Sequence, residues 1–238
     1  MADRTEFTKP VRHISRTVVK PSRLGQTKAM ADDSAYYYQP SDGHGLVHDP
    51  FNAIVGPRPI GWISSMSAAG NRNLAPYSFF NAFNYRPPII GFSTIGWKDT
   101  VANVEATGEF VWNLATMALA SRMNATSAHA PPEVDEFALS GLTPAPSRLV
   151  APARVLESPV NFECRLSQLI QLQSAVGAPV KAWLVLGEVV AVHINRDMLK
   201  DGVYDTAAAR PILRAGKMGD YAEIRPDAMF EMPRPDFA

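Results

Sequence analysis

Residues 57–65 read PRPIGWISS, residues 73–88 read NLAPYSFFNAFNYRPP, and residues 89–100 read IIGFSTIGWKDT. The first run alternates from Ile60 to Met66 as a strand does, and the Ala-Gly-Asn sequence at 69–71 is typical of a tight turn. A second run from Ala75 to Phe83 lies at hairpin distance, and Ile89–Thr94 is a third short strand. The period becomes helical at Thr100–Thr107, before Gly108. This stretch predicts a hairpin, a further strand and the start of a helix.

The rest of the chain continues the strand pattern. Strands are predicted at residues 109–114, 160–172 and 182–195, with Gly187 placed for a bulge in the last of them, and a short helix is predicted at 117–127. Long strands joined by hairpins, with few short helices, favour an antiparallel barrel. A Rossmann sheet is disfavoured, because no GxGxxG follows a strand and opens a helix.

Composition narrows the function classes. The 238 residues include 23 basic and 23 acidic side chains, so no net charge argues for a nucleic-acid partner. No apolar run has the length needed to span a bilayer, which predicts no membrane partner. The five histidines lack HExxH or paired metal spacing, so no metal site is predicted. The single cysteine excludes an intrachain disulfide and fits a cytoplasmic protein.

That cysteine, Cys164, lies in the run NFECRL. It could serve as a nucleophile. Its alternation with Glu163 and Arg165, on the side of Phe162 and Leu166, favours a buried strand residue instead.

Basic residues gather at the N-terminus. Residues 1–30 hold seven basic and two acidic side chains and no long apolar segment. We expect residues 1–30 to form a basic, disordered extension, and residues 31–238 to form a single domain. A transit peptide is an alternative that Asp3 and Glu6 weaken, and an upstream start codon, with Met30 as the natural start, is another.

The triplet Lys98-Asp99-Thr100 stands where the predicted helix begins. A helix N-terminus leaves backbone N–H groups free and carries positive partial charge, so it favours an anion, to which Lys98 adds a full charge and Thr100 a hydroxyl donor. The plainer interpretation is a helix cap made by Asp99 or Thr100, with Lys98 in solvent. These residues alone favour the cap.

Polar side chains also interrupt the aromatic strand 75–83. Ser78 and Asn81 are costly there unless their polar groups are paired, so they could contact the edge of a heteroaromatic ring or pair with barrel backbone. Trp62, Ser64 and Ser65 in the first strand pose the same question. Each signal is weak alone, and their joint placement beside a helix start is informative.

Six runs together resemble the flavin reductase-like family, the FMN-binding split barrels. They are YYYQPSDGHGLVHDPFNAIVGPRPIGWISS, NLAPYSFFNAFNYRPPIIGFS, KDTVANVEATGEFVWNL, VDEFALSGLTPAPS, ESPVNFECRL and VLGEVVAVHI. The resemblance runs from Ala35 to Tyr221 in order, and it leaves the first thirty residues outside. It implies a six-stranded antiparallel split β-barrel with a few flanking short helices, and a homodimer with FMN at the subunit interface.

The resemblance also implies the residues that hold the cofactor. Lys98, Asp99 and Thr100 match the segment that receives the phosphate, and His129 lies where a residue could approach the flavin ring. Two strand segments would accompany the flavin ring and ribityl chain: Trp62, Ile63, Ser64 and Ser65 in the first strand, and Ser78, Phe79, Phe80 and Asn81 in the second. No catalytic side chain is implied, because the flavin carries the chemistry.

The implied function is hydride transfer from NADH or NADPH to flavin. Reduced FMN would then leave for a partner oxygenase or pass its electrons onward. One alternative is a flavoredoxin-like electron carrier that oxidises NAD(P)H poorly. A second alternative is a barrel that binds another planar ligand such as haem, or that has lost cofactor binding.

Overall fold

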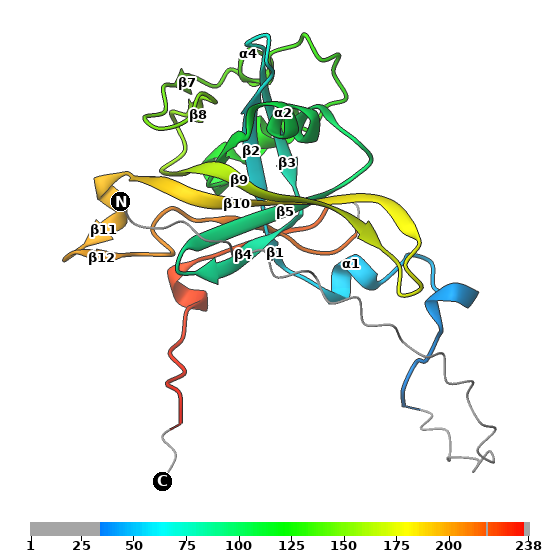
Figure 1. The fold of residues 1–238 in the computed structure, drawn as a ribbon. Helices are drawn as coiled ribbons and strands as arrows, with labels where there is room; N and C mark the ends of the chain where they lie inside the picture. The colour runs from blue at the N-terminus through cyan, green and yellow to red at the C-terminus, as the bar shows by residue number, and fades with distance from the viewer. Residues whose placement is uncertain (1–33, 218, 236–238) are drawn as a thin grey trace, which may run out of the picture. The chain divides into compact units, whose positions relative to one another are not determined.

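The computed structural model describes residues 34–217 and 219–235 (Figure 1). The prediction for residues 1–30 therefore lies outside the described residues. Two compact units are distinguished, divided between Gly45 and Leu46, and each is described by itself. In residues 34–45, a 3-10 turn η1 spans Pro40–Asp42, and the Tyr36 hydroxyl donates a hydrogen bond of 2.9 Å to the His44 carbonyl.

A seven-stranded antiparallel sheet forms the frame of residues 46–235 (Figure 1). Its strands lie in the order β3 (Arg72–Tyr77), β2 (Gly61–Met66), β6 (Glu109–Asn113), β9 (Val160–Gln173), β10 (Pro179–Ile194), β5 (Pro88–Ile95) and β4 (Phe79–Tyr85). The prediction of a mainly β antiparallel barrel is confirmed. The sheet has seven strands where six were expected, because the predicted strand 75–83 is divided at Ser78.

That division explains how the sheet curls. β3 pairs with β2 at one edge of the sheet, whereas β4 pairs with β5 at the opposite edge. Since Ser78 alone separates β3 from β4, the two edges of the sheet must approach each other where the chain crosses. The result is a half-closed barrel.

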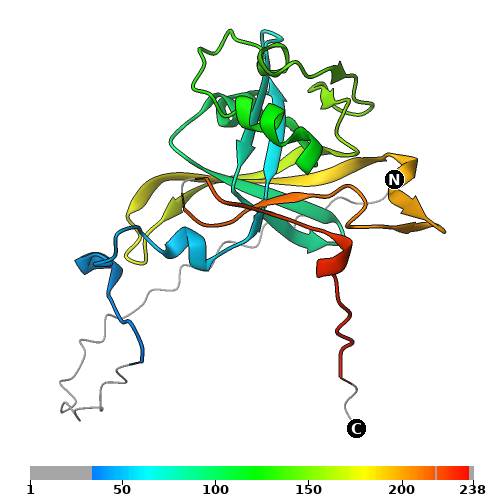
Figure 2. The ribbon, with the colours of Figure 1, turned by 180° about the vertical axis from the view of Figure 1, so that it is seen from behind.

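Short elements surround this sheet. In the view from the side opposite to Figure 1, α3 and the C-terminal strands β13 and β14 lie in front (Figure 2). Within the part of the chain that the structure describes, no helix is long and apolar enough to cross a membrane. The remaining elements are α1 (Phe51–Ile54), β1 (Arg58–Pro59), α2 (Asp99–Thr107), η2 (Met117–Leu119), α3 (Ala120–Ala125), α4 (Glu136–Ser140), β7 (Pro144–Ala145), β8 (Arg154–Val155), η3 (Arg196–Met198), β11 (Leu199–Lys200), β12 (Val203–Tyr204), β13 (Ile212–Arg214), β14 (Tyr221–Glu223) and η4 (Pro226–Ala228).

Two apolar cores hold the elements together. The first lies inside the barrel and includes Ile63, Phe92 and Phe110, packed with Val101 and Val104 of α2. The second lies on the other side of β2 and β3, against α3 and α4. Because successive side chains of a strand point to opposite faces, β2 contributes Ile63 to the first core and Trp62 to the second.

Two glycines are required by local geometry. Gly108 ends α2 with a φ of 73°, the left-handed conformation that glycine adopts without strain. At Gly187, a Cβ atom would lie 2.4 Å from Cε1 of Phe110, so the barrel interior leaves no room for a side chain there. The register of β9 against β10 shifts between Leu186 and Gly187, which confirms the predicted bulge.

Cys164 lies in the first core. Its side chain is fully buried among the core residues of β9, as the alternation predicts. Burial raises the pKa of the Cys164 thiol, so the unreactive thiol dominates at neutral pH.

Candidate functional site

The N-terminus of α2 offers free donors beside a cation. The N-cap residue is Lys98, in an extended conformation, and no side chain caps the helix. The alternative of a cap made by Asp99 or Thr100 is therefore wrong. In the first turn of a helix the backbone amides have no intrahelical partner, so the amides of Asp99 and Thr100 remain donors next to the Lys98 ammonium group.

A buried network of polar side chains positions Thr100. Asn73 of β3 donates hydrogen bonds from Nδ2 to Thr100 Oγ1, at 2.8 Å, and to Ser65 Oγ, at 3.0 Å. Asn103, one turn along α2, also donates to Ser65 Oγ, at 3.1 Å. Because the Thr100 oxygen accepts from Asn73, the hydroxyl proton of Thr100 is available to a further acceptor. Ser65 thus acts behind the helix terminus and holds both asparagines in place.

These groups line a pocket of about 410 Å³, which we call the α2 pocket. It opens between the start of α2, the strand β3, and the segment that follows α3. His129 from this last segment lines it. Its lining comprises Asn73, Ala75, Pro76, Tyr77, Trp97, Lys98, Asp99, Thr100, Thr126, Ser127, Ala128, His129, Ala130 and Glu136.

A second pocket continues the first along β3. It has a volume of about 510 Å³, and we call it the Tyr221 pocket. Pro76, Tyr77 and Ser127 line both pockets, so the two pockets adjoin along β3, and we refer to them together as the groove. The Tyr221 pocket is lined by Ile60, Pro76, Tyr77, Ser78, Asn124, Ser127, Arg214, Gly219 and Tyr221.

Tyr77 lies where the two pockets meet, and its buried hydroxyl makes no hydrogen bond of normal geometry, although the Thr100 hydroxyl lies near enough to act on it. The tyrosine is 6% exposed, and its ring packs 4.8 Å from that of Phe92. Burial raises the pKa of Tyr77 to about 12, and the nearby Thr100 hydroxyl opposes this rise only in part. A buried hydroxyl that lacks a good hydrogen bond is unfavourable, and a ligand in the groove could accept one from it.

Two acidic side chains line the groove, those of Asp99 and Glu136, and Glu136 has a structural partner. Its carboxylate accepts a hydrogen bond of 3.0 Å from the Leu74 amide, which joins α4 to β3. Burial raises the pKa of Glu136, and this backbone hydrogen bond opposes the rise.

The remaining candidates of the first strand lie beneath the groove. Trp62 and Ile63 are fully buried in the two cores, and the Trp62 indole donates a hydrogen bond of 3.0 Å to Thr126 Oγ1 at the α2 pocket. Ser64 is buried and donates to the carbonyl of Ala153. These side chains support the groove wall from behind.

The candidates of the second strand divide between two places. Ser78 lines the Tyr221 pocket. Phe79, Phe80 and Asn81 line a different pocket of about 510 Å³, beside α1 and β1. Phe80 also stacks on Trp112, with ring centres 5.5 Å apart and planes inclined by 7°. The structure therefore brings Ser78 to the groove, and it does not bring these three side chains there.

Several groove residues were missed by the sequence reasoning. Asn73 and Tyr77 belong to the quoted run NLAPYSFFN, where their alternation would have placed both on one face of the strand. Arg214 and Tyr221 come from the C-terminal strands, which carry no motif. The guanidinium carbon of Arg214 lies 5.0 Å from the centre of the Tyr221 ring, in a cation–π contact.

Comparisons with known proteins show the family of the chain. The family model described as flavin reductase like domain matches residues 56–212. The chain belongs to the flavin reductase-like family. An uncharacterized protein of Aquifex aeolicus is 36% identical to it over 169 residues, which cover 68% of this chain and 83% of that protein.

Solved structures of this family share its fold. Nitrilotriacetate monooxygenase component B from Bacillus cereus is similar over 90% of this chain and 99% of its own, with 27% identity and a TM-score of 0.71. A split-barrel protein from Shewanella frigidimarina is similar over 79% of this chain and 90% of its own, with 23% identity and a TM-score of 0.65. The fold is thus a split barrel, and the family indicates a flavin-related function.

Proposed function

We propose that this protein binds FMN in the groove and acts as a flavin reductase, with NADH or NADPH as the hydride donor. The observation that carries the proposal is the α2 pocket, which is lined by a lysine, the free amides at the start of α2, the Thr100 hydroxyl and the buried Tyr77 hydroxyl. When bound, FMN would supply the redox chemistry, since no side chain of the groove forms a catalytic pair.

The residues present fit a phosphate at one end of the groove. Lys98, the amides of Asp99 and Thr100, and the Thr100 hydroxyl are all donors, and phosphate oxygens only accept. The Tyr77 hydroxyl would gain the hydrogen bond that the chain itself does not give it.

The flavin ring would extend into the Tyr221 pocket. Ser78 and Ser127 supply hydroxyl groups there, while Ile60 and Tyr221 supply apolar surface. Phe79, Phe80 and Asn81 stay proposed cofactor residues through their backbone, which continues directly from Ser78, because their side chains line another pocket.

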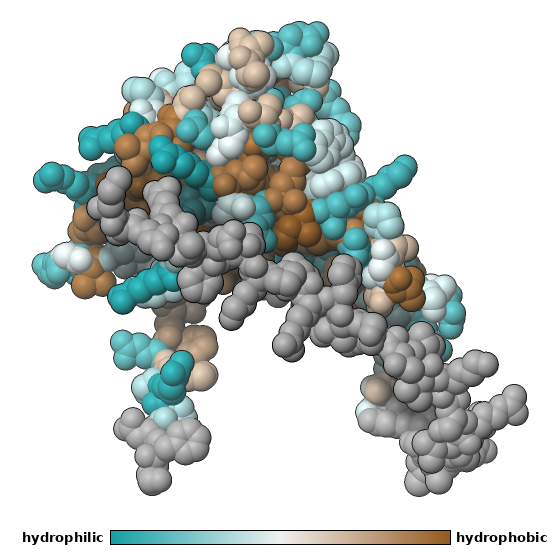
Figure 3. Space-filling view, viewed as in Figure 1, coloured by the Kyte–Doolittle hydropathy of each residue, from teal (hydrophilic) through white to brown (hydrophobic). Residues whose placement is uncertain are grey.

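A homodimer is part of the proposal. Neighbouring strands β9, β10, β5 and β4 expose apolar side chains, including Phe83 at 54%, Ile95 at 69% and Ile170 at 38%. Figure 3 shows hydrophobic residues over β5, β9 and β10 on one face. Light scattering should give twice the chain mass, and Phe83→Asp should lower it; a monomeric wild type would contradict the proposed dimer.

The name of the Bacillus cereus structure, component B of a monooxygenase, supports a partner oxygenase that would receive reduced flavin. A cytoplasmic location also stays a prediction.

The phosphate assignment is tested by comparing FMN with riboflavin, which lacks the phosphate. Lys98→Ala removes one charge-assisted hydrogen bond and should weaken FMN by about 1.5–3 kcal/mol, or roughly 10- to 150-fold, while riboflavin binding stays unchanged. Lys181→Ala, an exposed lysine on β10 that lines none of these pockets, is the matched control. Equal loss for both ligands would contradict the phosphate role of Lys98.

The reductase activity is tested without oxygen. The FMN-loaded protein should lose its flavin absorption within seconds to minutes of adding NADH or NADPH. A flavin spectrum that persists would contradict the reductase proposal and favour the flavoredoxin-like carrier.

A further inference from the structure

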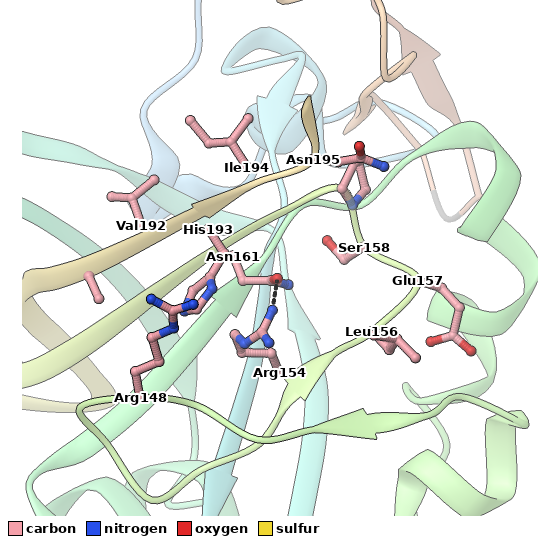
Figure 4. A pocket seen from close by; sticks show the side chains of 12 residues that line it. Arg148, Arg154, Leu156, Glu157, Ser158, Asn161, Val192, His193, Ile194 and Asn195 are labelled. Carbon is pink, nitrogen blue, oxygen red and sulfur yellow. Dashed lines mark hydrogen bonds between the residues drawn. The ribbon is translucent and has the colours of Figure 1, made fainter. Parts of the chain in front are cut away.

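A fourth pocket lies away from the groove, between the loop that connects β7 to β8 and the paired ends of β9 and β10 (Figure 4). Its volume is about 560 Å³, and it shares no lining residue with the α2 or Tyr221 pockets. We call it the Arg148 pocket. It is lined by Arg148, Arg154, Leu156, Glu157, Ser158, Pro159, Asn161, Ala191, Val192, His193, Ile194 and Asn195.

A fully buried carboxylate, that of Glu163, holds this region together. It accepts hydrogen bonds from the amides of Arg148, at 2.8 Å, and Leu149, at 2.6 Å, and its Oε1 lies 2.5 Å from His193 Nε2. Burial alone would raise the pKa of Glu163, but these contacts outweigh burial, and the pKa lies below its usual value. The carboxylate is thus ionised, and its oxygens are already bonded to two amides of the loop and to His193 of β10.

The guanidinium group of Arg154 is fixed beside it. It donates from Nη1 to Asn161 Oδ1, at 3.1 Å, and from Nε and Nη2 to the Pro146 carbonyl, both at 3.2 Å. Figure 4 shows Arg154 and Asn161 joined in this way, next to His193 and Arg148. A guanidinium has five N–H donors, so Arg154 keeps donors for a further acceptor.

Arg148 adds a second guanidinium group. Its side chain is exposed and makes no hydrogen bond or ion pair with any residue in 34–217 or 219–235. Glu157, the acidic lining residue, receives hydrogen bonds from Arg122 and Thr143 instead. When the Arg122–Glu157 ion pair is counted as neutral, two guanidinium groups at the pocket face the one buried carboxylate of Glu163 behind it, which leaves one positive charge in excess.

We propose that the Arg148 pocket binds a small organic anion, held through its carboxylate or phosphate group by Arg148 and Arg154. Planar guanidinium groups match the oxygens of both groups and form charge-assisted hydrogen bonds with them. Leu156 and Val192, both more than half exposed, supply apolar surface for the body of the ligand. The volume is in the range of small-molecule sites. This proposal does not depend on the proposed flavin reductase activity.

Calorimetric titration with inorganic phosphate and with benzoate tests this proposal. The titrations use the full chain carrying Lys98→Ala, so that phosphate does not occupy the α2 pocket. We expect one site per chain. Adding Arg148→Ala should weaken binding about tenfold or more, as expected for the loss of one charge-assisted hydrogen bond. Arg148→Lys, which keeps the charge, should weaken it less.

The matched control is Arg196→Ala, which removes an exposed arginine of η3 that does not line the pocket. It should leave both affinities unchanged. Tighter binding of phosphate would assign a phosphate ester as the ligand, and tighter binding of benzoate a carboxylic acid. Millimolar phosphate and benzoate that both fail to bind, or binding that Arg148→Ala leaves unchanged, would overturn the proposal.

Discussion

Replacing Tyr77 by phenylalanine should stabilise the flavin-free protein and weaken its binding of FMN. The substitution removes only the hydroxyl, which is buried and makes no hydrogen bond of normal geometry where the two parts of the groove meet. The ring contact with Phe92 is retained. The two effects have opposite signs, because the buried hydroxyl lowers stability without ligand and strengthens FMN binding when the ligand accepts a hydrogen bond from it.

The magnitudes follow from the state of that hydroxyl. An unsatisfied buried polar group costs about 1–3 kcal/mol, so Tyr77→Phe should raise the free energy of unfolding by about 1 kcal/mol. For a chain of this size that raises Tm by roughly 2–4 °C. Losing a hydrogen bond to FMN of about 1–3 kcal/mol weakens Kd roughly 5- to 150-fold.

The assay combines thermal unfolding of flavin-free protein with FMN titration of the wild type and Tyr77→Phe. A third measurement is stability at high pH. Because the native pKa of Tyr77 is raised to about 12, its protonated form stabilises the fold below the unfolded pKa of about 10, and this contribution is lost as pH rises toward 12. Tyr77→Phe should lack that loss. A variant that is less stable without flavin and binds FMN as tightly as wild type would refute the reasoning.

Three further predictions concern buried polar groups. Thr100→Val leaves one N–H of Asn73 without an acceptor and should lower the free energy of unfolding by about 1–3 kcal/mol in denaturant titrations, whereas Thr100→Ser should lower it by about 1 kcal/mol or less. Because the native pKa of Glu163 is depressed, the ionised carboxylate stabilises the fold above the unfolded pKa of about 4.3, and this contribution is lost as pH falls through the native pKa. The free energy of unfolding in urea should therefore depend less steeply on acid pH in Glu163→Gln than in wild type. Cys164 should react with a thiol reagent only after unfolding, and prompt labelling of the native protein would contradict its burial.

Much of the fold follows from local pattern. Alternating side chains indicated β2, β6, β9 and β10, because one face of each strand contacts the core. Gly108 marked the end of α2, and Gly187 the bulge that accommodates Phe110. The division at Ser78 was not predictable from the run 75–83, since it depends on pairing with different strands on either side.

The candidate site was predictable only in part. Lys98 and Thr100 stand at a helix start, which is a local signal. The Tyr77 hydroxyl and the Asn73 amide gain their roles from neighbours on α2, which sequence spacing alone does not place. Phe79 was assigned with Ser78 because the whole segment 78–81 matched the resemblance, although adjacent residues of an extended chain point to opposite sides, and here the two line different pockets.

The central claim is that FMN binds in the groove formed by α2 and β3, with its phosphate at Lys98 and Thr100. The most direct measurement is a titration of flavin-free protein with FMN and with riboflavin, followed by flavin fluorescence and absorption. The account predicts saturation at one FMN per chain, with riboflavin bound more weakly by at least tenfold, the equivalent of about 1.4 kcal/mol. FMN that leaves both spectra unchanged, or riboflavin that binds as tightly as FMN, would contradict it.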